Sequence, residues 1–203
     1  MTTTGRARND LVMATEFILG AKATGSDGLC GEVVRTILDP ATKTVTYLVI
    51  EPRHRMADGR LVPVELVEAG AGEIRLRCSI AEFDRLAPAE EIELVQGLDY
   101  PGGIGMGMDL GYQPPIITSD NVPEGESEVA HHERVHAADG EIGRLKGFAV
   151  DPVDHRVTHV LLREGHLWGR KDVAIPASAV ASVDNGIWLK LTKKQVAALP
   201  PRD

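Results

Sequence analysis

Cysteine is scarce in this sequence. Its 203 residues include only Cys30 and Cys78, and no spacing motif surrounds either of them. Two isolated cysteines are more typical of free thiols in a reducing compartment than of a disulfide. We therefore expect both thiols to be free.

Long apolar runs are absent as well. Nowhere do 18 apolar residues stand together, the length that a candidate membrane-spanning helix requires. The first 16 residues also lack the apolar run of a signal peptide. We therefore expect a cytoplasmic protein without a transmembrane segment. Peripheral docking on a membrane complex stays open.

An excess of positive charge is the third absence. The formal net charge is −8 and the isoelectric point is near 5.4, which argues against nucleic-acid binding through a general basic field. The charge is uneven, however. Residues 96–130 hold six acids and no Lys or Arg, whereas residues 133–203 hold 11 bases and 9 acids. RNA binding through the second half is therefore kept as an alternative.

What the sequence does contain is an internal repeat. The turn signal Asp27-Gly-Leu-Cys-Gly31 recurs 112 residues later as Asp139-Gly-Glu-Ile-Gly143, and Asp39-Pro40 recurs at the same shift as Asp151-Pro152. A match in turns, strands and the terminal helix indicates one unit copied in tandem. We assign a structural turn role to the residues Asp27, Gly28, Gly31, Asp139, Gly140 and Gly143.

The pattern within each copy is that of an all-β fold. Short segments rich in β-branched and aromatic residues, of which Thr44 to Ile50 is the most secure, alternate with turn signals at intervals of about 8 to 12 residues. Ser79 with Glu82 and Thr192 with Gln195 carry the capping-box signature, which predicts a short helix at the end of each copy.

These patterns divide the chain into four parts. We expect a flexible N-terminus over 1–16, a first domain over 17–88, a linker over 89–130 and a second domain over 131–203. A domain of roughly 70 residues buries only about 60% of its unfolded surface and is marginal alone. The two copies should therefore pack on each other within the chain, form a homo-oligomer, or pack on a partner.

The linker has an unusual composition. It is acidic and rich in Gly and Pro, and it has neither strand alternation nor helical period. Its simplest interpretation is a disordered tether. The alternative is packing along a domain or a partner, because the linker holds many apolar residues: Ile104, Met106, Met108, Leu110, Tyr112, Ile116 and Ile117.

Candidate chemical motifs are weak. His132-Glu-Arg-Val-His136 matches the zinc-protease string, with His131 beside it, but that chemistry requires a helix. The repeat places the string on a strand, where residues 132 and 136 lie about 13 Å apart at about 3.3 Å per residue. The Gly-rich segment 102–107 lacks the Lys, strand and helix of a phosphate-binding loop. We expect no enzyme, catalytic residue, metal or cofactor; a metal-dependent hydrolase using the His cluster is the least favoured hypothesis.

Trp168, Arg170 and Trp188 have the best claim to function. Trp and Arg dominate protein interfaces, and neither Trp has an aromatic counterpart in the first copy. On the expected strand Ile187 to Leu191, Trp188 faces away from the apolar residues. The three residues are predicted to bind a protein partner. Packing against the other copy or the linker is the alternative.

The repeated unit resembles the PRC-barrel family. The resemblance rests on the opening apolar strand, the Asp-Gly-x-x-Gly and Asp-Pro turns, the Pro that opens Val62-Pro-Val-Glu65 and Ile175-Pro-Ala-Ser178, and the closing helix. It covers 17–88 and 133–201 and implies two tandem, strongly bent small β-barrels. It also implies a bacterial protein with an adaptor or assembly role, without catalysis. The partner would be a protein whose identity the resemblance does not supply.

Overall fold

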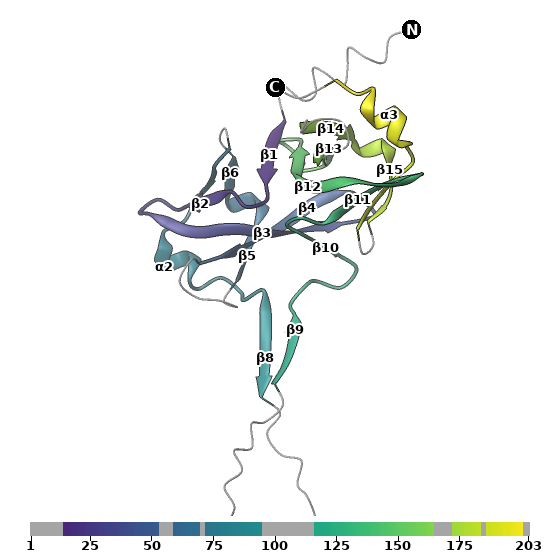
Figure 1. Ribbon diagram of the computed structural model, residues 1–203. Coiled ribbons are helices and arrows are strands. Elements are labelled where there is room, and N and C mark those ends of the chain that lie inside the picture. Colours follow the sequence, from purple (N-terminus) through teal and green to yellow (C-terminus); the bar gives the residue numbers. More distant parts are fainter. Residues whose placement is uncertain are drawn as a thin grey trace, which may run out of the picture.

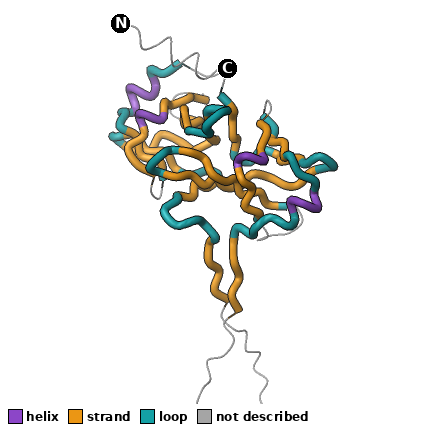
Figure 2. The backbone as a smooth tube through the Cα atoms, turned by 180° about the vertical axis from the view of Figure 1, so that it is seen from behind, coloured by secondary structure: helices purple, strands orange, loops and turns teal. Residues whose placement is uncertain are grey.

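The protein is described by a computed structural model over residues 14–52, 59–69, 72–94, 116–164, 172–183 and 186–200. These residues form two seven-stranded sheets, a separate two-stranded ribbon and two short helices (Figure 1). Traced as a tube, the body is dominated by strands, and the ribbon projects from it (Figure 2). The expected all-β class with short helices is confirmed.

The first sheet follows the order β5-β4-β3-β2-β7-β6, with β10 paired to β3. All its pairings are antiparallel except β2 with β7, which run parallel. Its strands are β2 (Lys22–Thr24), β3 (Leu29–Asp39), β4 (Thr44–Glu51), β5 (Arg60–Pro63), β6 (Val67–Ala69), β7 (Ile74–Leu76) and β10 (Ser127–Ala130).

The second sheet repeats this topology in the order β14-β13-β12-β11-β16-β15, with β1 paired to β12. Here β11 and β16 form the parallel pair. In both sheets the hydrogen-bonded path is open within the described residues, because its two end strands are not paired with each other. The strands are β1 (Thr15–Ile18), β11 (Arg134–Ala137), β12 (Gly140–Val150), β13 (Val157–Glu164), β14 (Asp172–Pro176), β15 (Val180–Val183) and β16 (Ile187–Leu189).

Both expected capping boxes are present. The Ser79 side chain accepts from the Glu82 N–H and the Glu82 carboxylate accepts from the Ser79 N–H, which opens α2 (Ile80–Phe83); Thr192 and Gln195 do the same for α3 (Lys193–Ala197). Satisfying these donors matters because the first N–H groups of a helix have no partner within it. The helices lie at opposite ends of the body (Figure 1). A 3₁₀ turn follows Pro63 as η1 (Val64–Leu66) and Pro176 as η2 (Ala177–Ala179).

The two copies exchange their first strands. β1 opens the first copy but pairs with β12 of the second, and β10 occupies the equivalent place before the second copy but pairs with β3 of the first. Adding 112 to the bounds of β1, 15 and 18, gives those of β10, 127 and 130. The expected start of the first domain, residue 17, lies within β1, and this strand completes the other sheet. The N-terminus expected to be loose also contributes residues 15 and 16 to that strand.

The reciprocal relation between the two copies also appears where the tip of the β3–β4 hairpin meets the tip of the β12–β13 hairpin. The Val45 N–H donates to the His155 carbonyl (3.0 Å), and the Val157 N–H donates to the Lys43 carbonyl (2.8 Å). Lys43 and His155 occupy equivalent positions and both have positive φ, 59° and 56°. A reciprocal contact of this kind is the signature of an isologous interface, normally formed between two chains.

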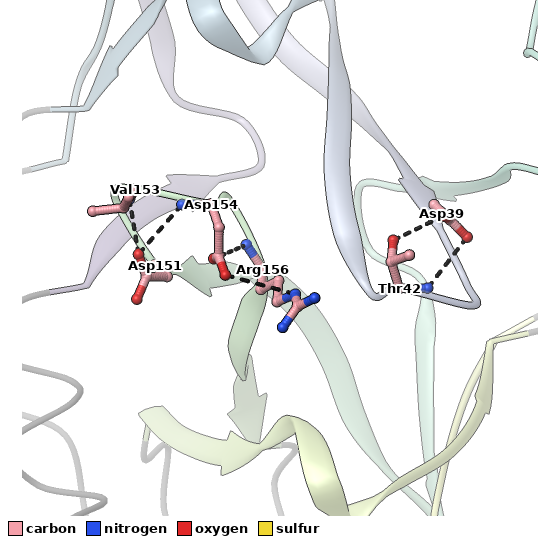
Figure 3. Close-up of polar contacts among 6 residues, drawn as sticks. All are labelled: Asp39, Thr42, Asp151, Val153, Asp154 and Arg156. Atoms are coloured by element: carbon pink, nitrogen blue, oxygen red, sulfur yellow. Dashed lines mark hydrogen bonds and ion pairs between the residues drawn. The ribbon is translucent and has the colours of Figure 1, made fainter.

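Each hairpin tip is held by the aspartate of its Asp-Pro turn (Figure 3). Asp39 accepts from the Thr42 hydroxyl at 2.7 Å, and Asp151 accepts from the Val153 N–H at 2.8 Å. The Thr42 hydroxyl, as the main cause, and the Ala41 N–H lower the pKa of the Asp39 carboxyl through their hydrogen bonds. Asp151 thus has a turn-forming role like that of Asp39.

The exchanged strands are anchored in different ways. β10 is tied to β3 by an ion pair in which the Arg35 guanidinium contacts Glu128 at 3.1 Å and Glu90 at 2.6 Å. β1 instead places Phe17 opposite Phe148, and both rings are fully buried. A Cβ at Gly147, the position equivalent to Arg35, would lie 2.1 Å from the Phe17 carbonyl oxygen, so β1 requires glycine there.

One hydrophobic cluster runs through both copies. It joins Phe17, Leu48 and Phe83 of the first copy to Phe148 and Val196 of the second. The main core is thus shared between the sheets, whereas a smaller cluster around Ile37 belongs to the first sheet. Intramolecular packing of the two copies, one of the three expectations, is what the structure contains.

The expectation that 89–130 has no strands is wrong at three places. β8 (Glu90–Leu94) and β9 (Ile116–Asp120) pair as the projecting ribbon, and β10 follows. Alternation of apolar and polar residues arises where one face of a strand packs on a core. β8 and β9 form a separate two-stranded ribbon, so their sequences need not alternate. The remaining part of the expected tether, 95–115, lies outside the described residues.

Two of the features expected to be absent, a disulfide bond and a membrane-spanning helix, can be compared with the described residues. Cys30 and Cys78 are buried and free, and burial raises the pKa of both thiols. Within the described ranges, neither short helix has the length or apolarity needed to cross a membrane.

Candidate binding face

Of the three residues predicted to bind a partner, the structure describes one. Trp168 and Arg170 lie outside the described residues. Trp188 is central in β16 and keeps 44% of its surface exposed, while Ile187 and Leu189 on either side are buried. The expectation that Trp188 faces away from the core is confirmed.

Trp188 forms a stack with His136. The two residues are paired in the parallel register of β11 and β16, and their ring centroids lie 4.2 Å apart at an interplanar angle of 13°. An aromatic ring kept in place by a neighbour loses little conformational freedom on binding, which favours it as an interface anchor. We call this pair the His136–Trp188 stack.

Three arginines form a row beside this stack. Arg134 of β11 is directly opposite Arg144 of β12, and Arg144 is directly opposite Arg163 of β13. Their side chains are 60%, 46% and 62% exposed. Directly opposed residues point to the same face of a sheet with Cβ atoms about 5 Å apart, and like charges so placed destabilise it. We call Arg134, Arg144 and Arg163 the arginine row.

Two carboxylates partly neutralise the row. Glu141 lies 3.9 Å from both Arg134 and Arg144, at the limit of an ion pair. Asp172 lies 3.7 Å from Arg163 and also pairs closely with Lys146. These contacts are exposed or half-exposed, so each contributes little to stability. They leave guanidinium donors of the row available to a ligand.

The first copy has opposite charges at two of the three equivalent positions. Subtracting 112 converts Arg134, Arg144 and Arg163 into 22, 32 and 51, which are Lys22, Glu32 and Glu51. These three residues are also paired in one row across β2, β3 and β4. The common framework therefore does not require arginine at any of them.

Sequence reasoning missed the arginine row. The three residues are 10 and 19 positions apart and lie in no basic run, so the strand register alone brings them together. The signal that could have found them was the repeat itself. Aligned on the shift of 112, the two copies differ in charge at two of three positions that share one face.

The His cluster predicted as a weak metal candidate has a different geometry. His131 and His132 lie in a turn and stack on each other at a centroid distance of 3.7 Å, whereas His136 lies on β11 and stacks on Trp188. Within the described ranges, no group of three His, Cys, Asp or Glu side chains is arranged to hold a metal ion. The zinc-protease string is not helical in this structure.

The two turn aspartates have equivalent structural contacts. Asp27 accepts from the Ile80 N–H and Asp139 accepts from the Lys193 N–H, each at 2.8 Å and each at the first residue of a helix. Gly31 and Gly143 are both required for the same steric reason. A Cβ at these positions would lie 2.1 Å and 2.4 Å from the carbonyl oxygens of Glu51 and Arg163. These contacts explain the repeated turn as a structural feature and require no catalytic role for its residues.

A pocket opens at one end of the arginine row. It has a volume of about 350 Å³ and is lined by His131, His132, Glu133, Arg134 and Arg144. Burial lowers the pKa of His131, as do the charges of His132 and Arg163, while Glu32 acts in the opposite direction. The Arg144 guanidinium donates to the His132 carbonyl at 3.3 Å, which holds the turn against the sheet.

Comparison of the chain with models of known protein families found no match, and comparison with curated proteins found no similar sequence.

Proposed function

We propose that this protein is a non-enzymatic adaptor built from two PRC-type β-barrels, whose second copy binds an acidic segment of a protein partner. The barrel assignment is supported by the repeated strand order, the strongly paired long hairpins and the closing helices. The function is supported by the exposed face that carries the arginine row and the His136–Trp188 stack.

The arginine row is the observation that carries the proposal. Three like charges at directly opposed positions cost stability, and the first copy forms the same row with Lys22, Glu32 and Glu51. The first copy carries two acids in this row where the second carries arginines, so the all-cationic row of the second copy is suited to a ligand of opposite charge. Arg also offers a planar, bidentate donor set suited to carboxylates.

The neighbouring stack adds the apolar part of an interface. Trp and Arg are the residues whose truncation most often costs more than about 2 kcal/mol of binding free energy. Trp188 and His136 lie next to Arg134, because residues 134 and 136 share the outward face of β11. A partner segment could therefore contact the ring with an apolar side chain and the row with its carboxylates.

An RNA ligand fits this face less well. Glu141 and Asp172 lie among the cations, and the whole chain carries a net charge of −8, so the field along a phosphate backbone would be weak. An acidic peptide needs only a few local pairs. RNA is therefore an outcome of the test rather than the favoured ligand.

The test compares partner binding by the parent protein with binding by a variant in which two charges of the arginine row are reversed. Arg144→Glu/Arg163→Glu places the residues of the first copy on the second, and Arg75→Glu/Arg85→Glu gives the same charge change on exposed residues elsewhere. Proteins captured by each tagged form would be identified, and the acidic segments of those retained would be synthesised and titrated directly. We expect at least a tenfold loss of peptide affinity for the first variant and for Trp188→Ala, and none for the control.

Two results would contradict the proposal. Equal losses for both double variants would mean that net charge, and not the face, governs binding. Capture that is abolished by nuclease treatment and falls steeply with salt would assign RNA as the ligand. Circular dichroism and thermal unfolding of each variant would verify that the fold is intact.

A further inference from the structure

The pocket lined by His131, His132, Glu133, Arg134 and Arg144 has more hydrogen-bond donors than the protein uses. Among the described residues, the imidazole nitrogens of His131 and His132 form no hydrogen bond, and the Arg134 guanidinium contacts only Glu141, at 3.9 Å. The pocket is thus a concave group of donors, in which the Arg144 guanidinium makes one hydrogen bond, to the His132 carbonyl at 3.3 Å.

We propose that this pocket binds a phosphomonoester group. Arg134 and Arg144 are directly opposed across β11 and β12, so their Cβ atoms lie about 5 Å apart and both guanidiniums can reach one anion. A phosphate offers three terminal oxygens and nearly two negative charges at neutral pH, so it can accept from both arginines and a histidine together. A carboxylate offers two oxygens and one charge.

The carboxylates of the site limit which anions can bind. Glu141 contacts Arg134 and Arg144 at 3.9 Å, and Glu133 also lines the pocket. A single carboxylate entering the pocket would gain little over Glu141. A phosphate dianion forms shorter, charge-assisted bonds of about 2.8 Å to the guanidiniums.

The position of the pocket relates it to the proposed partner-binding face. Arg134 and Arg144 belong both to the pocket and to the arginine row, so a phosphorylated side chain could enter the pocket while its acidic neighbours contact Arg163. This assignment to a partner segment rests on the proposed function. Binding of the phosphoryl group itself does not, and a free phosphate metabolite offers the same chemistry.

The experiment titrates the full-length protein with three probes while the His131 and His132 ring signals are followed by NMR. The probes are inorganic phosphate, a phosphoserine peptide rich in Asp and Glu, and the same peptide unphosphorylated. We expect saturable shifts with the phosphopeptide, a dissociation constant below about 1 mM, and at least tenfold weaker binding of the unphosphorylated form. Arg134→Gln/Arg144→Gln should weaken phosphopeptide binding at least tenfold, whereas Arg156→Gln at the distant hairpin tip should not.

The results of the three titrations distinguish the phosphoryl site from the proposed adaptor function. Saturable phosphate binding as tight as that of the phosphopeptide supports the pocket but assigns it to a free metabolite. Equal binding of both peptides overturns the phosphoryl site and leaves the adaptor proposal intact. Two further results would overturn the phosphoryl site. One is a set of shifts that do not saturate by about 20 mM phosphopeptide or phosphate, because that binding would be far weaker than the expected dissociation constant of about 1 mM. The other is a loss of phosphopeptide binding in Arg156→Gln equal to that in Arg134→Gln/Arg144→Gln.

Discussion

The two halves of this molecule share one framework and differ on their surfaces. Turns, strand order, helix caps and the exchanged strands correspond residue by residue at a shift of 112 or 113. The cross-strand row on the outer face is Lys22, Glu32 and Glu51 in one half and Arg134, Arg144 and Arg163 in the other. Each half is therefore a control for the other: what both retain serves the fold, and what one changes is available for function.

The largest effect is expected where the two exchanged strands differ most. Phe17→Ala removes a fully buried ring from the pair with Phe148, and the expected loss of unfolding free energy is about 3–5 kcal/mol. The equivalent change in β10, Val129→Ala, removes less apolar volume opposite Thr36 and should cost less. Chemical denaturation of both variants measures the difference. Equal losses would mean that β1 is not held by this aromatic pair.

The polar anchor of β10 gives the second comparison. Arg35→Ala leaves Glu90 and Glu128 close together without their cation, and these groups are 15–25% exposed. We expect a loss of about 1–3 kcal/mol, since breaking a partly buried pair leaves uncompensated charge. Although burial by itself lowers the pKa of Arg35, its bonds to the two carboxylates raise it. A loss that disappears when Glu90 and Glu128 are also replaced by Gln would verify the mechanism; a loss that persists would not.

The helix caps should give matched, smaller effects. Ser79→Ala and Thr192→Ala each remove a capping box, and each is expected to cost about 1 kcal/mol. Because the main hydrophobic cluster spans both copies, both variants should shift the same single unfolding transition. Calorimetry is the measurement. Two separate transitions, each sensitive to one variant, would show that the halves unfold independently.

Features of the fold that are encoded by neighbouring residues could be predicted from the sequence, whereas features that depend on distant residues could not. The repeat, the Asp-Gly turns, both capping boxes and the outward direction of Trp188 were predictable, because each is encoded within a few residues. Strand exchange was not. β1 and β10 occupy equivalent positions beside similar long strands, so their patterns are the same whether each pairs with its own copy or the other.

The site was predictable only in part for a similar reason. Trp188 was found as an unmatched aromatic residue, but the arginine row depends on register across three strands. No local pattern distinguishes Arg144 from any exposed strand residue. The difference appears only when β12 and β3 are compared position by position, with Arg144 replacing Glu32.

A small pH effect should distinguish the copies. The pKa of His131 is lowered mainly by burial, so the unfolded chain takes up this proton first as pH falls. Its contribution to stability is therefore complete above the unfolded pKa of about 6.5 and declines as pH falls from there towards the lower folded value. His131→Leu, which introduces the residue of the first copy at this position, Leu19, should remove that decline. Stability would be measured from pH 8 to 5; an unchanged profile would contradict the assignment.

The smallest effect is expected from cutting the chain between the halves. A protease site inserted between Gly103 and Ile104 would divide it into two fragments after folding. Each fragment holds a strand that belongs to the other's sheet, β1 in one and β10 in the other, and both share the main core. We therefore expect the cleaved fragments to elute together at the mass of the intact chain.

The control for this cut is cleavage in the Phe17→Ala background. Removing the aromatic pair weakens the contact of β1 with β12 and the part of the shared core that Phe17 fills, so fragments that separate there but not in the parent would show that β1 helps to hold the halves together. Separation in the parent would mean that the connection between the copies maintains the exchange. Reciprocal strands, unlike a single docking surface, must both release before the halves can part, and this is why the chain should behave as a covalently joined two-fold dimer.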